Sequence, residues 1–345
     1  MANDFARSKP SVFLHIGRAK AGSSTVQGLV EDHRPALEAA GYACPLTAAG
    51  GANRADLARA LSGDGPPDPL EAFSRTLAGP GRVFVSAEAF LSIPAAAIDS
   101  LKDRLGARRA RILIYVRDYP AWVVSLYAQH TKLGRNVRDF DSFMGVMSGQ
   151  ASIRKPLERW AQAFGDEAIR LRPLTPDSLA GGRLETDLLA ALGIDLPVES
   201  RIRNAAPPWM ALELQRAAAA AVREAGGADL SREGALALIR SFTAATPPDA
   251  LRVQYLTPSH WRLLADSYDR DMETLGRRFG FATAPSGPPP PERLFLPQAS
   301  EIPAPVLAAA AASLGRGKVA GRIDPASLGV IRARIGQLAA DADRA

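Results

Sequence analysis

A short stretch near the start of the chain combines the residue types that bind an anion. Residues 14–27 read LHIGRAKAGSSTVQ, so a loop with Gly17, Lys20 and Gly22 joins a buried apolar run to a hydroxyl-rich helix start. The two glycines would let the backbone turn and approach an oxygen closely, and the lysine would supply a mobile positive charge. Hydroxyls would come from the first helical turn, at Ser23, Ser24 and Thr25. The competing interpretation is a tight structural turn in which Ser23 is an ordinary N-cap.

The loop differs from two common nucleotide-binding patterns. In the kinase pattern GxxxxGK[ST], Gly17 and Gly22 are correctly spaced, but Ser23 stands where the lysine belongs. No later predicted strand ends in an aspartate suited to Mg²⁺, which a phosphoryl transferase usually needs. The dinucleotide pattern GxGxxG is also absent. We therefore expect the loop to bind a phosphate-like anion by a pattern other than these two motifs.

A second candidate contact follows the apolar run at 111–116. Arg117 ends this predicted strand, and Ser125 follows eight positions later, about one turn into the next helix. Because α/β sheets bind ligands at the carboxyl ends of their strands, this spacing could bring both side chains to one phosphate. The plainer alternative pairs Arg117 with Asp118 or another surface acid and makes Ser125 a helix-face residue.

These residues need a parallel sheet to position them. Runs at 11–16, 82–87 and 111–116 predict buried strands, and 168–174 predicts a fourth. Helical patterns follow three of them, at 23–40, 120–134 and 185–193, and one short helix is expected among the loops that precede residue 82. Alternating strands and helices predict an α/β fold, a three-layer P-loop-like parallel sheet flanked by helices, with a helical C-terminal part.

The rest of the chain reads as helical. Helices are expected at 208–225, 231–245 and 258–280, and the PSGPPPP stretch at 285–291 can propagate neither a helix nor a sheet ladder. We therefore predict one domain over 1–283, in which 200–283 is mainly helical. Residues 284–345 then form a Pro-rich linker and a tail with two helices, which either pack back on the body or mediate self-association.

Composition limits the classes of partner. A formal charge of +6 suits an anionic ligand, but no basic run with interleaved aromatics indicates nucleic acid. The single cysteine, Cys44, excludes an intrachain disulfide and a cysteine zinc cluster, and it favours a reducing, cytoplasmic location. No apolar run is long enough to cross a bilayer, so no transmembrane segment is predicted.

Taken together, the two motifs resemble those of the sulfotransferase superfamily. The stretch IGRAKAGSSTVQ is similar to the family's 5′-phosphosulfate loop, and RDYPAWVVSLYAQHTKLG is similar to its 3′-phosphate motif. The resemblance covers about residues 11–283 and implies 3′-phosphoadenosine-5′-phosphosulfate (PAPS) as donor. It implies contacts from Lys20 to the 5′-phosphate and bridging oxygen and from Arg117 and Ser125 to the 3′-phosphate. Ala21, Gly22, Ser23, Ser24 and Thr25 would cradle the phosphosulfate.

The same resemblance places a base after the second strand, at Glu88. There the family uses histidine in its soluble small-molecule enzymes and commonly glutamate in its carbohydrate-modifying ones, and this chain reads VFVSAEAF. A solvated glutamate at a helix start is the alternative, and His130 is the next candidate base. The phenol and steroid enzymes carry a late Arg-Lys-Gly stretch and a tryptophan directly after the hydroxyl pair, and the matched part of this chain has neither. These departures favour the bacterial carbohydrate or lipid branch, with a hydroxyl of a sugar, glycolipid or other polar metabolite as acceptor, which the helical part at 200–283 would face. The four histidines and one cysteine give no metal-ligand pattern, so no metal is expected. A nucleotide-dependent kinase and a noncatalytic nucleotide-binding module remain the rival functions.

Overall fold

The computed structural model describes residues 11–199, 206–247, 255–288, 299–315, 319, 321–342 and 344. The chain divides into two compact units, each discontinuous in sequence. The first unit comprises Met1–Tyr119, Ser152–Arg203 and Ala265–Ser286. The second comprises Pro120–Ala151, Asn204–Leu264 and Gly287–Ala345. The predicted domain boundary at residue 283 stays a prediction.

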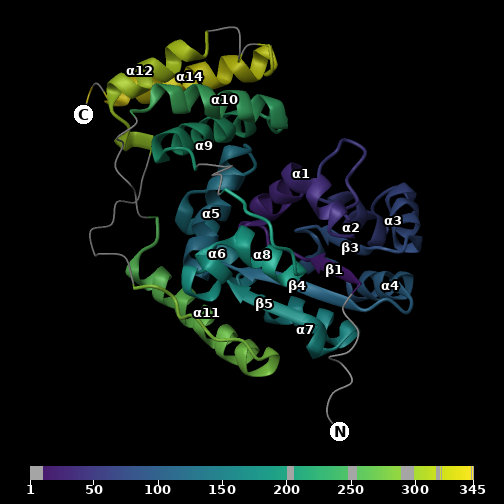
Figure 1. The fold of residues 1–345 in the computed structure, drawn as a ribbon. Coiled ribbons are helices and arrows are strands. Elements are labelled where there is room, and N and C mark those ends of the chain that lie inside the picture. The colour runs from purple at the N-terminus through teal and green to yellow at the C-terminus, as the bar shows by residue number, and fades with distance from the viewer. Residues whose placement is uncertain are drawn as a thin grey trace. The chain divides into compact units, whose positions relative to one another are not determined.

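The first unit is built on a five-stranded parallel sheet with the strand order β2-β3-β1-β4-β5 (Figure 1). The strands are β1 (Val12–His15), β2 (Tyr42–Ala43), β3 (Arg82–Ser86), β4 (Ala110–Val116) and β5 (Ile169–Pro173). The four predicted strands and the parallel α/β class are confirmed. β2 was not predicted, because its two residues are too few to show a pattern.

Helices cover the two faces of this sheet. On one face Phe13 and Phe84 pack with α1 (Ser23–Ala39) and α8 (Leu184–Leu192) in one hydrophobic core. Neighbouring residues along each strand point to the opposite face. That face lies on the side of α4 (Ala95–Leu105) and α7 (Arg154–Phe164), which contact each other. The unit therefore has the three layers expected of a sheet buried on both sides.

The sequence missed several helices of the first unit. Two helices, α2 (Ala55–Leu61) and α3 (Asp68–Ala78), stand where one was expected. α4 and α7 were not predicted either. The helix α4 is short and begins directly after Pro94, in a segment whose alanines give little hydrophobic contrast.

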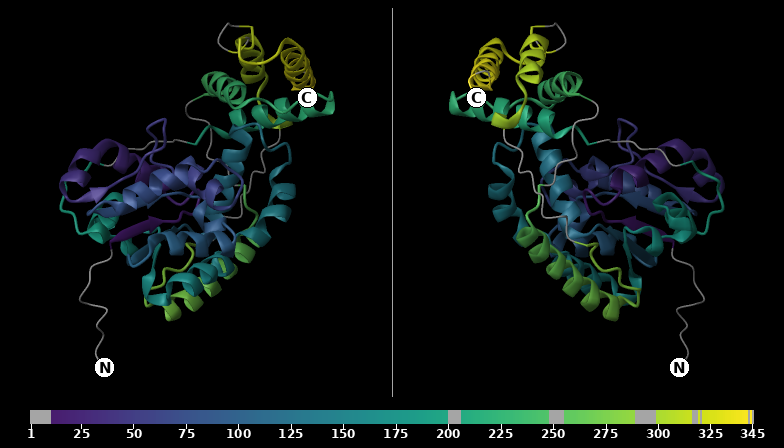
Figure 2. Two further views of the ribbon diagram at one scale, coloured as in Figure 1. Left: turned by 90° about the vertical axis from the view of Figure 1, so that its right-hand side faces the viewer. Right: turned by 90° about the vertical axis from the view of Figure 1, so that its left-hand side faces the viewer.

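The second unit is helical. It contains α6 (Phe140–Met147), α9 (Trp209–Glu224), α10 (Arg232–Ala245), α12 (Ala304–Ser313) and α14 (Pro325–Ala342). Two further helices begin in one unit and end in the other, namely α5 (Tyr119–Lys132) and α11 (Pro258–Phe279). The helices α9, α10, α12 and α14 pack into one bundle, green to yellow in both views of Figure 2. The predicted C-terminal helices are thus present, and their role in self-association stays a prediction.

No helix among the described residues has both the length and the apolar character needed to cross a bilayer. Part of the predicted linker, from residue 289 to 291, lies outside the described residues.

Candidate functional site: the loop between β1 and α1

The predicted anion-binding loop connects the central strand to a helix. β1 ends at His15 and α1 begins at Ser23, so residues 16–22 form the connection at the carboxyl edge of the sheet. Three of its residues have a positive φ, which is 107° at Gly17, 66° at Lys20 and 86° at Gly22. A Cβ at Gly22 would also overlap the end of the Leu184 side chain, which would have to shift, so the positive φ is the main reason for glycine at this position.

The start of α1 presents backbone donors without partners. Among the described residues, the N–H groups of Gly22, Ser23 and Ser24 make no hydrogen bond. Gly22 occupies the N-cap position and supplies no side-chain cap. The hydroxyl of Ser23 donates to the Arg18 carbonyl oxygen at 3.0 Å, so Ser23 is not the N-cap that the alternative interpretation required. Uncapped N–H groups at the positive end of a helix dipole are the elements of an anion site.

Glu88 lies against the entry to this loop. A Cβ at Gly17 would stand 2.8 Å from the Glu88 carbonyl oxygen and 3.2 Å from its Cα, so the two backbones are in close contact. Burial raises the pKa of the Glu88 carboxyl, and the positive charge of Lys20 opposes this shift. The structure therefore brings the candidate base and the candidate lysine into one electrostatic environment.

The surroundings of Glu88 differ from those of a solvated glutamate at the start of an α-helix. Glu88 lies in a turn closed by the Phe90 N–H and the Ala87 carbonyl oxygen at 3.1 Å, and the next α-helix begins at Ala95. It thus lies just before a short 3₁₀ helix at Phe90–Ser92 and does not lie in the first turn of an α-helix. Its raised pKa makes it a stronger base than an exposed glutamate, because desolvation disfavours the carboxylate.

A histidine lies beneath the loop. His15 is fully buried, and its Nδ1 shares a hydrogen bond of 2.8 Å with the Ser86 hydroxyl. Burial lowers the pKa of His15 to about 4, so the ring is neutral near pH 7. The Gln27 side chain reaches the same hydroxyl at 3.5 Å. His15 thus supports the ends of β1 and β3 from within the core.

A polar cluster behind the loop was missed by the sequence analysis. Arg18 is only 6% exposed, and its guanidinium carbon lies 5.5 Å from the centre of the Tyr119 ring. Tyr119 donates its hydroxyl to Asp271 at 2.7 Å, and Ser152 donates to the same carboxylate at 2.6 Å. Burial lowers the pKa of Arg18 to about 10, while Tyr119 and Asp271 oppose that shift. Because Asp271 lies so far from the loop in sequence, no spacing could reveal the cluster.

The other predicted contacts fall in different places. Arg117 directly follows β4 in the first unit and is half-buried. Its side chain makes no ion pair with Asp118 or with any other described residue, so the plainer alternative does not account for it. Ser125 and His130 both lie in α5 within the second unit. The His130 ring packs on Phe143 with the ring centres 5.8 Å apart, and burial lowers its pKa. The joint use of Arg117 and Ser125 stays a prediction.

The donor set of the loop fits an anion. It consists of N–H groups, hydroxyls and one ammonium group, all of which donate hydrogen bonds. Within the described part of the chain, no group of three or more histidine, cysteine or acidic side chains could hold a metal ion.

Comparison with known proteins adds two findings. No family model matches the chain. An uncharacterized protein of Archaeoglobus fulgidus is 31% identical over 126 residues, a match that covers 36% of this chain and 34% of that protein. The chain thus matches about a third of the length of this relative. The description of that protein gives no activity.

Among solved structures, the crystal structure of a sulfotransferase from Alicyclobacillus acidocaldarius is similar to this chain. The alignment covers 80% of this chain and 98% of the other, with a TM-score of 0.39 and 14% sequence identity. At these values the similarity assigns no activity to the chain. The structure itself establishes an α/β protein whose central parallel strand leads into a loop with the donors of an anion site.

Proposed function

We propose that the chain is a sulfotransferase that uses PAPS and transfers its sulfuryl group to a hydroxyl of a sugar, glycolipid or other polar metabolite. The observation that carries this proposal is the loop before α1, where Lys20 and three unpartnered N–H groups lie beside a half-buried carboxyl group, that of Glu88. The resemblance of the loop and of the Arg117 segment to sulfotransferase motifs supports PAPS over other anionic nucleotides. A cytoplasmic location is part of the proposal, based on the single cysteine.

Each residue has a role in the proposed transfer. When bound, PAPS supplies an activated sulfuryl group on a phosphate leaving group. The N–H groups of Gly22, Ser23 and Ser24 and the Lys20 ammonium would hold the phosphosulfate and offset the charge that develops on the leaving oxygen. Glu88 would take the proton of the acceptor hydroxyl as its oxygen bonds to sulfur. Arg117 and Ser125 would bind the 3′-phosphate and align the nucleotide.

Nucleotide selectivity tests the proposal. Isothermal titration calorimetry should show that adenosine 3′,5′-bisphosphate binds without Mg²⁺ and more tightly than ATP. Incubation with radiolabelled PAPS and a panel of sugars and glycolipids should then label an acceptor. Tight ATP binding that requires Mg²⁺ would instead identify the rival kinase. Binding of the bisphosphate without transfer to any acceptor would favour the noncatalytic module.

A further inference from the structure

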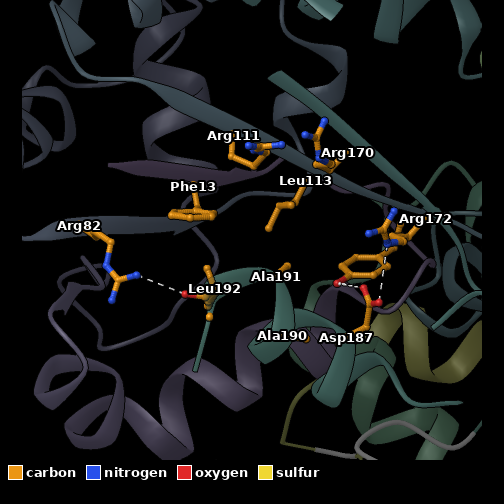
Figure 3. Close-up of a pocket in the computed structure, with 12 residues that line it drawn as sticks. Phe13, Arg82, Arg111, Leu113, Arg170, Arg172, Asp187, Ala190, Ala191 and Leu192 are labelled. Carbon is orange, nitrogen blue, oxygen red and sulfur yellow. Dashed lines mark hydrogen bonds and ion pairs between the residues drawn. The ribbon is translucent and has the colours of Figure 1, made fainter. Parts of the chain in front are cut away.

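A cavity of about 360 Å³ lies on the sheet face that α8 covers (Figure 3). Its floor is formed by β1, β4 and β5, and its wall by the carboxyl end of α8 at Ala190–Gly193. Figure 3 shows Arg111 and Arg170 close together on neighbouring strands, across the cavity from Ala191. None of the residues proposed to bind PAPS lines it.

The register of the sheet explains why arginines gather here. Leu113 pairs with Arg170, and Tyr115 pairs with Arg172. Alternate residues share a face, so Arg111 joins these four side chains on the cavity side. On the opposite face of β5, Ile169 and Leu171 are buried. The edge strand β5 therefore presents apolar residues to one layer and arginines to the other.

Not all of the positive charge in the cavity is compensated. Arg172 pairs with Asp187 at 3.7 Å. Arg82 stacks 4.1 Å from the Tyr42 ring centre and donates to the carbonyl oxygens of Ala40 and Leu192.

Besides Arg82, two guanidinium groups of the cavity have no opposite charge among the described residues. Arg170 donates only to the carbonyl oxygens of Glu167 and Ile169, at 3.1 and 2.8 Å, which do not neutralise it. The Arg111 guanidinium makes no hydrogen bond or ion pair with any described residue. Burial lowers the pKa of both groups, and Arg170 lowers the pKa of Arg111 further by repulsion. Two adjacent, half-buried cations that share no counter-ion favour an anion between them.

Apart from Tyr115, which donates its hydroxyl to Asp187, the remainder of the lining is apolar. Phe13 and Leu113 form the floor beside the arginines, and Ala190 and Ala191 leave room above them. A purely inorganic anion would leave this surface in contact with water, whereas an apolar group would bury it. We propose that the cavity is a second ligand site, which binds a small organic anion with an apolar body, its acidic group held by Arg111 and Arg170.

This site is separate from the loop before α1. Arg111 and Arg170 lie near the amino ends of β4 and β5, whereas ligands of the loop bind at the carboxyl ends of the strands. Main chain connects the loop to β4, because the Ile16 N–H donates to the Leu113 carbonyl oxygen at 3.0 Å and the Tyr115 N–H donates to the Gly17 carbonyl oxygen at 3.3 Å. Because the two arginines and the loop lie at opposite ends of the strands, a nucleotide in the loop would not displace a ligand from the cavity.

Titration of the full chain with 1-anilinonaphthalene-8-sulfonate, an apolar sulfonate that fluoresces when buried, tests the proposal. We expect one saturable site, not displaced by adenosine 3′,5′-bisphosphate, and at least tenfold weaker binding of the uncharged N-phenyl-1-naphthylamine. Arg111→Gln should weaken sulfonate binding by tenfold or more. Ala191→Phe should do the same by filling the cavity, with all charges kept. Arg75→Gln, at a side chain that is 75% exposed, is the matched control and should leave binding unchanged.

Three results would overturn the proposal. Displacement of the dye by the bisphosphate would place it in the loop. Absence of saturable binding would mean that the arginines of β5 serve only to protect an exposed sheet edge. If Arg111→Gln and Arg75→Gln weakened dye binding equally, with thermal unfolding unchanged in both, the loss would come from the change in net charge alone. These outcomes do not depend on whether the chain transfers sulfuryl groups.

Discussion

The backbone of Glu88 lies against Gly17, so close that a Cβ on the glycine would stand 2.8 Å from the Glu88 carbonyl oxygen. Gly17 also has a φ of 107°, which residues with a side chain rarely adopt. The loop therefore meets the candidate base twice, through the main chain at Gly17 and through the charge of Lys20.

Gly17→Ala should disturb both stability and nucleotide binding. The backbone conformation alone should lower the free energy of unfolding by about 1–3 kcal/mol, and overlap with Glu88 should add to this loss. Urea unfolding and calorimetry with adenosine 3′,5′-bisphosphate would measure the two effects. Gly41→Ala is the matched control, because Gly41 has a φ of 83° but a Cβ there meets nothing within 4 Å. Equal losses in the two variants would contradict the close contact.

Lys20→Ala should weaken the binding of adenosine 3′,5′-bisphosphate about ten- to hundredfold, as expected for one lost charge-assisted contact of about 1.5–3 kcal/mol. Its fold should be kept, since alanine at a φ of 66° is strained no more than the lysine already is. Lys102→Ala, on the exposed side of α4, serves as control. Unchanged affinity in purified Lys20→Ala would remove the lysine from the site.

Arg117→Ala should discriminate between nucleotides. If Arg117 binds the 3′-phosphate, adenosine 3′,5′-bisphosphate should lose about tenfold or more in affinity, and adenosine 5′-monophosphate should lose less than about twofold. The exposed Arg104, on α4, provides the control substitution Arg104→Ala. Calorimetry with both nucleotides decides, and an equal loss for the two would show that Arg117 acts on the fold.

Glu88→Gln should separate binding from chemistry. Glutamine keeps the size of the side chain but removes the basic site, so turnover should fall about 10²–10⁴-fold while bisphosphate affinity is retained. In the parent, single-turnover rates should decline toward acid pH. Because its pKa is raised, Glu88 takes up a proton at a higher pH than an ordinary glutamate does. Glu71→Gln, at a side chain that is 68% exposed, should change nothing. Turnover within about twofold of the parent would leave His130 as the next residue to test.

The same substitution should change how stability depends on pH. Because burial raises the pKa of Glu88, the folded state binds more protons than the unfolded state between the ordinary and the raised pKa. The free energy of unfolding of the parent therefore loses a contribution as pH rises through that window. Glu88→Gln lacks this loss, so its stability relative to the parent should be greater at pH 7 than at pH 3. Urea titrations at both pH values measure it, and a difference that does not change with pH would show that the pKa is not raised.

Local patterns predicted what depends on neighbouring residues. The strands at 82–87 and 111–116 and the helix at 23–40 match β3, β4 and α1 within two residues at each end, because each carries a continuous apolar run or a periodic face. The sequence also predicted that Gly17 and Gly22 turn the backbone, and both have a positive φ. Glycine is favoured at these positions by the local backbone conformation, which a short motif can predict.

Contacts between distant segments could not be read in this way. The association of Arg18 with Asp271 depends on the return of α11 to the sheet, and the arginine cavity depends on the register of β4 with β5. Neither Arg111 nor Arg170 stands in a motif, and each looks like an ordinary polar residue at a strand start. Only the pairing of Leu113 with Arg170 places their charges side by side.

The central place of β1 has a consequence for synthesis of the chain. Val12 pairs with Val83 on one side and with Ala110 on the other, so the first strand made is completed only after the fourth has left the ribosome. At translation rates of about 5–20 residues per second, β1 waits on the order of ten seconds for its second neighbour. During that time at least one edge of this apolar strand is unpaired and open to association with other nascent chains. Yield on expression should therefore respond to chaperone supply more than to mutations in the C-terminal helices.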